Sequence, residues 1–110
     1  MEPTIFFPAW RDLVRYSGPG PDPAILIDDP GFRALVVGLE PGGRIPPHPE
    51  RSAVYHVLEG SGFMTVDGER YPLTEGATVI APAGSSRGIE AETRLAFIAV
   101  RVGLEPESSR

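Results

Sequence analysis

The stretch that decides the fold is residues 53–82, AVYHVLEGSGFMTVDGERYPLTEGATVIAP. Short apolar segments alternate in it with turn residues, a pattern typical of β-strands. Asp67-Gly68 lies between two of these segments and predicts a tight hairpin turn. The strands predicted within the stretch are Ala53–Leu58, Phe63–Val66, Arg70–Leu73 and Thr78–Ala81.

The pattern continues on both sides of this stretch. Further strands are predicted at Ala24–Ile27, Phe32–Leu39 and Leu95–Val102. Seven short strands joined by Gly/Pro turns predict an all-β fold, an antiparallel sandwich or barrel, over residues 24–104. Residues 1–23 are predicted to form an extended arm with one or two helical turns near Trp10, and residues 105–110 a polar tail.

Two of the predicted strands are apolar on both faces. Ala53–Leu58 and Leu95–Val102 place apolar side chains at odd and even positions alike, whereas a strand with one solvated face alternates apolar with polar residues. A second layer must therefore cover the outer face. For so small a domain we expect that layer to be a second copy of the chain, a homodimer with the arm packed across the partner.

Composition excludes several classes of function. The 110 residues carry a net charge of −5 and contain no Cys, and all ten basic residues are Arg. Thiolate nucleophiles, thiolate zinc sites and Schiff-base lysines are thereby excluded. An acidic chain without Lys is not expected to bind nucleic acid, and its apolar runs are too short to predict a membrane helix. No signal peptide is recognised, so the default expectation is a cytoplasmic protein.

Three segments carry a resemblance to a known family. Pro41–His48 followed by Val54–Gly62 resembles the first motif of the cupins, and Gly76–Gly84 resembles the start of their second motif. The resemblance implies a jelly-roll barrel that is usually dimeric. It implies no single activity, because cupins include dioxygenases, isomerases, seed-storage proteins and ligand-sensing domains.

The resemblance also shows which residues stand at the family's metal-ligand positions. Many cupins hold a divalent metal through two His residues, a Glu and a third His, and these positions match Pro46, His48, Ala53 and Arg87 here. Only His48 retains a ligand side chain. A guanidinium keeps its proton and cannot coordinate a cation. The sequence therefore favours no metal and no other cofactor.

A rearranged site for a divalent transition metal is the alternative. Its ligands would be His48, Glu50 and His56. Strand alternation opposes this set, because His56 faces outward if Ala53 faces inward.

The leading functional hypothesis is a metal-free module that binds a small anionic molecule inside the barrel. Arg87 is its predicted anchor, with His48 and Tyr55 as polar contacts. For Arg87 the structural alternative is an ion pair with Glu50, Glu90 or Glu92. No catalytic residue is assigned. The alternative functions are a metal-dependent dioxygenase or isomerase at the rearranged site, and a structural or interaction domain whose cavity is filled by its own side chains.

Overall fold

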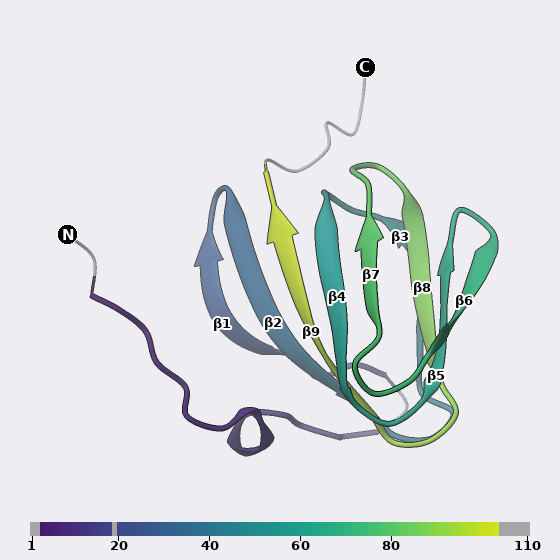
Figure 1. Cartoon of the computed structure of the whole chain (residues 1–110), viewed down its shortest axis with the longest axis horizontal. Helices are drawn as coiled ribbons and strands as arrows, with labels where there is room; N and C mark the ends of the chain where they lie inside the picture. The colour runs from purple at the N-terminus through teal and green to yellow at the C-terminus, as the bar shows by residue number, and fades with distance from the viewer. Residues whose placement is uncertain (1–2, 19, 104–110) are drawn as a thin grey trace.

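The computed structural model describes residues 3–18 and 20–103 and shows two antiparallel sheets that face each other (Figure 1). One sheet has the strand order β1-β2-β9-β4-β7, and the other has the order β3-β8-β5-β6. The elements are η1 (Trp10–Asp12), β1 (Ala24–Asp29), β2 (Phe32–Leu39), β3 (Arg44–Pro49), β4 (Ala53–Glu59), β5 (Gly62–Val66), β6 (Glu69–Leu73), β7 (Thr78–Ala81), β8 (Ser86–Ala91) and β9 (Leu95–Val102). The predicted all-β jelly-roll fold is confirmed.

The described residues form nine strands, and two of them, β3 and β8, are not among the seven predicted from the sequence. β3 contains Pro46 and Pro47, which donate no backbone hydrogen bond, and its pairing with β8 shifts register between Ile45 and His48. Proline is tolerated there because β3 is an edge strand. The expected helical turns are reduced to one 3₁₀ turn, η1.

The hairpin turn between β5 and β6 has the predicted chemistry. Asp67 and Gly68 both have positive φ, 48° and 86°. Two consecutive residues with positive φ define the type I′ turn, which matches the twist of the strands it joins. This turn is a confirmed prediction.

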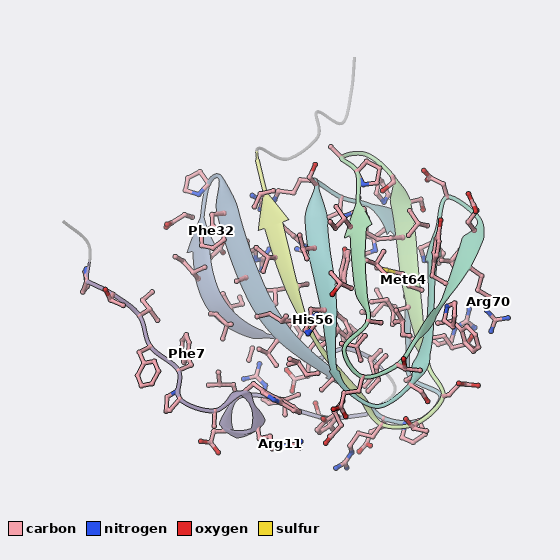
Figure 2. The ribbon with its side chains drawn as sticks, in the orientation of Figure 1. Phe7, Arg11, Phe32, His56, Met64 and Arg70 are labelled. Carbon is pink, nitrogen blue, oxygen red and sulfur yellow. The ribbon has the colours of Figure 1, made fainter. Side chains whose placement is uncertain are left out.

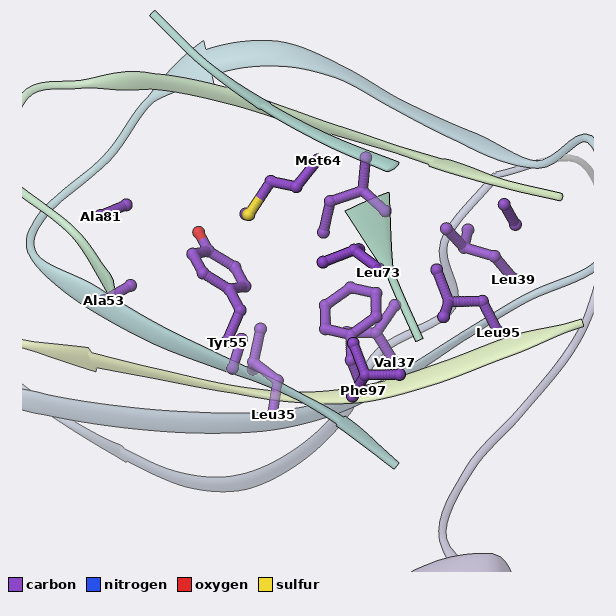
Figure 3. Close-up of a cluster of buried hydrophobic side chains, with 14 residues drawn as sticks. Leu35, Val37, Leu39, Ala53, Tyr55, Met64, Leu73, Ala81, Leu95 and Phe97 are labelled. Carbon is purple, nitrogen blue, oxygen red and sulfur yellow. The ribbon is translucent and has the colours of Figure 1, made fainter. Parts of the chain in front are cut away.

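The barrel interior is built from successive rows of cross-strand neighbours (Figure 3). One row across β2, β9 and β4 consists of Leu35, Ala99 and Tyr55. The next row on one side of it consists of Val37, Phe97 and Val57. The Tyr55 and Phe97 rings pack with their centroids 6.2 Å apart. In the opposite direction the row after Leu35–Ala99–Tyr55 is Arg33, Arg101 and Ala53, so the interior becomes cationic at that end.

The arm contacts the barrel from Arg11 onwards, where Arg11 Nη1 lies 2.6 Å from Glu59 Oε1 at the end of β4. The Tyr16 ring lies against Gly38 of β2, where an added Cβ would come within 2.7 Å of the ring. Phe7, in the first half, projects beside the barrel (Figure 2). The predicted tail at 105–110 lies outside the described residues. No helix in the described part of the chain is long and apolar enough to cross a membrane.

Candidate functional site: a cavity at the arginine end of the barrel

A cavity of about 170 Å³ lies between the two sheets at the cationic end. Its walls are mostly apolar, and four polar side chains gather in its lining: His48, Tyr55, Arg87 and Arg101. The three residues predicted to bind a ligand are therefore brought together. The remaining lining residues are Leu35, Val37, Ile45, Ile89, Phe97 and Ala99 from the strands, with Pro21 and Pro23 from the arm.

Arg87 lies inside the barrel, as predicted, and is only 1% exposed. β8 directs it inward, where its guanidinium meets oxygens from two loops and from β4. Its Nε donates to the carbonyl of Ser85 (3.2 Å), Nη1 to the carbonyl of Arg51 (2.8 Å) and to the Tyr55 hydroxyl (3.4 Å), and Nη2 to the carbonyls of Pro82 (2.7 Å) and Glu50 (3.2 Å) and to Ser85 Oγ (2.8 Å).

These contacts use all the N–H groups of the Arg87 guanidinium. It has five N–H groups, and six protein oxygens lie within hydrogen-bond distance of its nitrogens. The expected alternative, an ion pair with Glu50, Glu90 or Glu92, is wrong within the described residues: only the backbone of Glu50 contacts Arg87, and the Glu90 carboxylate lies 4.0 Å from Arg70. The side chain instead joins the β3–β4 loop to the β7–β8 loop.

His48 and Tyr55 present polar atoms to the cavity from opposite sheets. His48 pairs with Arg87 across β3 and β8, and its Nδ1 lies 3.2 Å from the carbonyl oxygen of Pro46. A carbonyl only accepts, so Nδ1 is the donor and Nε2 is the nitrogen available to another group. Tyr55 is buried on β4, and its hydroxyl oxygen accepts from Arg87.

The three residues of the alternative metal set do not converge. His56 lies on the outer face of β4, where its Nδ1 is 2.7 Å from Thr78 Oγ1. The Glu50 carboxylate is directed to Arg101, with Oε2 3.3 Å from Nη1. Within residues 3–18 and 20–103, no three His, Asp or Glu side chains form a group that could hold a metal ion.

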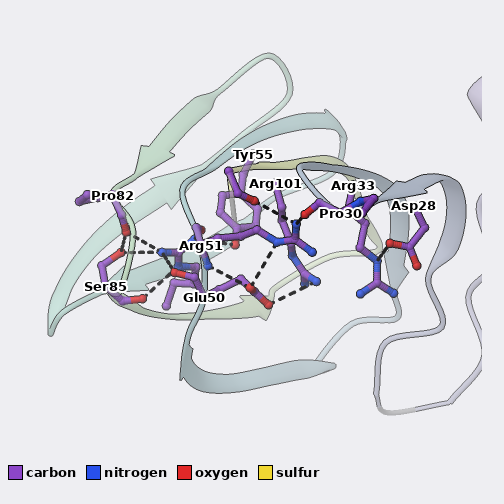
Figure 4. Close-up of polar contacts among 11 residues, drawn as sticks. Asp28, Pro30, Arg33, Glu50, Arg51, Tyr55, Pro82, Ser85 and Arg101 are labelled. Atoms are coloured by element: carbon purple, nitrogen blue, oxygen red, sulfur yellow. Dashed lines mark hydrogen bonds and ion pairs between the residues drawn. The ribbon is translucent and has the colours of Figure 1, made fainter. Parts of the chain in front are cut away.

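Sequence reasoning missed Arg101, which lines the cavity beside Arg87. The signal was present in the strand alternation. Leu95, Phe97 and Ala99 lie on one face of β9, and Arg101 is the next residue on that face. Arg101 lies in a row of charged groups with Arg33, Glu50 and Asp28 (Figure 4).

The cupin-domain family model matches residues 35–101, which include β2 to β9 almost completely and all four polar residues of the cavity. The chain belongs to the cupin family. Like the fold itself, this membership confirms the resemblance seen in the motifs.

Two solved structures match this cupin over nearly its full length. A conserved protein of unknown function from Streptococcus pyogenes has a TM-score of 0.80 and 24% identity, with 98% of this chain and 93% of that chain covered. A protein from Thermus thermophilus has a TM-score of 0.81 and 22% identity, with 89% and 97% covered. At this identity the similarity shows the fold alone.

Larger proteins contain a comparable unit. Over 73 residues this cupin is 27% identical to a mannose-1-phosphate guanylyltransferase of Klebsiella pneumoniae, covering 64% of this chain. The chain spans 16% of that relative's length. A salicylate 1,2-dioxygenase of Pseudoaminobacter salicylatoxidans has a TM-score of 0.71 and 22% identity, with 77% of this chain and 27% of that one covered.

Proposed function

We propose that this cupin binds a small organic anion in the barrel cavity. The observation that carries the proposal is the charge of the lining: two arginines, Arg87 and Arg101, line the cavity, and none of its lining residues carries a carboxylate. A low-dielectric cleft lined by one sign of charge concentrates ligands of the opposite sign.

The size and polarity of the cavity support a compact ligand with an apolar body. An apolar protein cavity of about 150 Å³ holds a benzene ring, and this one is about 170 Å³. Apolar walls with a few convergent polar groups are typical of small-molecule sites. The ligand class supported is thus a monocarboxylic acid with a small ring or a short branched chain.

A stability screen tests the proposal. A ligand that binds only the folded protein stabilises it by about 2.7 kcal/mol at 100 times its Kd. For a domain of this size that corresponds to a Tm increase of roughly 10–20 °C. We expect benzoate and isobutyrate to raise Tm at constant ionic strength, and neutral benzamide and isobutyramide to leave it unchanged. Equal responses to the acids and their amides would refute the proposal.

We also propose that the partner of this chain is a second copy of itself. Phe6 is 79% exposed in the arm, Ile5 and Phe7 beside it are exposed as well, and Ile80 is 74% exposed on β7. β7 is an edge strand of its sheet and offers unpaired backbone groups. Three consecutive exposed apolar side chains and an exposed apolar edge are complementary surfaces within one sequence.

The test is the molar mass in solution. Light scattering after size exclusion should give twice the 11.8 kDa chain mass for the parent protein. Phe6→Ser combined with Phe7→Ser should give the monomer mass, and a control change of an exposed arginine outside the arm, Arg70→Ser, should leave the dimer intact. A monomeric parent, or a dimer that survives the double substitution, would contradict the proposal.

A further inference from the structure

Two arginines lie directly opposite each other at the cationic end of the barrel. Arg33 of β2 and Arg101 of β9 are Cα partners in the antiparallel ladder, so their side chains leave the same face of the sheet. Like charges at such positions destabilise a sheet. The repulsion between Arg33 and Arg101 therefore needs a nearby group of negative charge to offset it.

The described residues do not supply a hydrogen-bond acceptor for every N–H group of these two arginines. The Nε atoms of Arg33 and Arg101 are both buried and have no hydrogen-bond partner. For Arg33 the nearest carboxylate oxygen is Asp28 Oδ1, at 3.8 Å, which is beyond hydrogen-bond distance. A buried donor without an acceptor is costly, and an incoming anion would remove that cost.

The contact between Arg101 and Glu50 involves only one side of the Arg101 guanidinium. Glu50 Oε2 lies 3.3 Å from Nη1. Nη1 is on the side of the planar group opposite the Nε–H bond, so the edge formed by Nε and Nη2 is not used by Glu50. That edge offers two parallel N–H groups, the geometry that binds a carboxylate through both oxygens.

Resting on the proposed function, we infer that Arg101 is the residue that anchors the ligand and that Arg33 is its neighbouring charge. The carboxylate of the ligand accepts hydrogen bonds from the Nε–Nη2 edge of Arg101, and its apolar body lies in the cavity that Arg101 lines. Arg87 has no free N–H to offer. It acts as a positioning residue that holds the two loops and the Tyr55 hydroxyl.

The recognised class is therefore a singly charged carboxylate rather than any anion. The edge of Arg101 that Glu50 does not use matches two coplanar oxygens, and the Glu50 carboxylate already neutralises part of the local charge. A doubly charged oxyanion such as inorganic phosphate gains less at this site, because Glu50 repels its second charge.

The experiment measures the anchor and the cavity separately. Titrations use three probes at constant ionic strength: benzoate, neutral benzamide and formate, a carboxylate without an apolar body. Binding is followed by calorimetry and by the Nε–Hε signals in NMR spectra of protein labelled with ¹⁵N-arginine. Arg101→Met removes the fork, Arg101→Lys keeps only the charge, and Arg33→Met removes the neighbouring charge. Arg70→Met is the matched control, because Arg70 is 61% exposed and stacks on the Phe63 ring outside the cavity.

We expect benzoate to bind the parent protein, benzamide not to bind, and both carboxylates to shift the Arg101 Nε–Hε signal. Arg101→Met should weaken benzoate binding about 10- to 100-fold, the range for a hydrogen bond between charged groups. Arg101→Lys should recover only part of that loss. Arg33→Met should weaken it less, about threefold to tenfold, since its contribution is a screened charge. Arg70→Met should bind like the parent protein.

Each failure has a different meaning. If benzoate binds the parent and Arg101→Met equally well, the anchor is overturned and the proposed function stands. If formate shifts the Arg101 signal but benzoate binds no tighter than formate, the anchor stands and the cavity is not the site of the ligand's body. If neither carboxylate binds, both proposals fail. Arg33→Met also removes a like-charge contact, so its unbound form should be at least as stable as the parent.

Discussion

Replacing Arg87 by methionine should destabilise the barrel strongly. Methionine has a similar length and no donor, so the substitution leaves backbone carbonyls of two loops without their partner inside the barrel. The three shortest contacts, at 2.7, 2.8 and 2.8 Å, are hydrogen bonds to a charged donor. At about 1.5–3 kcal/mol each they sum to roughly 4–9 kcal/mol.

The net loss is smaller than that sum, because methionine also removes the cost of burying a guanidinium without a carboxylate. Allowing about half of the sum for this relief leaves a loss of about 3 kcal/mol in the free energy of unfolding. For a domain of this size the corresponding decrease in Tm is roughly 12–24 °C.

Urea unfolding followed by far-UV circular dichroism measures this change. Arg87→Lys should recover a minor part of the stability, since one ammonium cannot reach all of these oxygens. Arg70→Met, which removes an exposed arginine with a ring contact, should cost less than about 1 kcal/mol. A loss below about 1 kcal/mol for Arg87→Met, with the m-value unchanged, would refute the reasoning that this side chain holds the two loops.

Three further outcomes follow from the same structure. Gly38→Ala places a Cβ 2.4 Å from the Arg15 carbonyl oxygen, so we expect the arm to undock and limited trypsin digestion after Arg15 to accelerate, whereas an unchanged cleavage rate would show that the arm does not pack there. In Gly60→Ala the added Cβ would lie 1.9 Å from the Arg94 carbonyl oxygen, and residue 60 has a φ of 90°. Backbone strain alone costs about 1–3 kcal/mol, so the free energy of unfolding measured in urea should fall by more than about 3 kcal/mol, and a smaller loss would contradict the close approach. Hydrogen bonds from Ser17 and Arg15 lower the pKa of the Asp22 carboxyl from its ordinary value of 3.8. Because the pKa of Asp22 is lower in the folded protein, its carboxylate stabilises the folded arm above pH 3.8, and this stabilisation is lost as the pH falls through the lowered pKa. The NMR signals of the arm should therefore change in that window, and Asp22→Asn should abolish the change.

Strands with regular apolar patterns could be predicted from the sequence. β2, β4 and β9 carry mostly apolar residues on the inner face, with Arg33 and Arg101 as exceptions at one end, and the Asp67-Gly68 turn has the residues that its backbone conformation requires. These features are local, so they are visible in a single sequence.

The two strands that carry His48 and Arg87 could not be predicted in this way. β3 is rich in proline and pairs only as an edge strand, and β8 contains Ser86, Arg87 and Gly88 in place of the usual apolar alternation. Their structure depends on contacts with distant segments. The family motif predicted that Arg87 points into the barrel. Its hydrogen bonds to backbone carbonyls could not be predicted, because they depend on where the two loops lie in the folded chain.

The residue that sequence reasoning overlooked shows a different limit. Arg101 lies on the inner face of β9 by simple alternation, but a charged residue near the end of a strand does not by itself indicate a cavity. The pairing of β2 with β9 shows that Arg33 and Arg101 lie opposite each other. The position of Glu50 shows which edge of the Arg101 guanidinium it does not use. Both facts join residues from separate strands and loops.

The arginine that ties the β3–β4 loop to the β7–β8 loop is part of the polypeptide itself. A tie of this kind has no dissociation constant and cannot be exchanged, diluted or removed by a chelator. The two loops are therefore joined by folding alone, and this link does not depend on an ion taken from the surrounding solution.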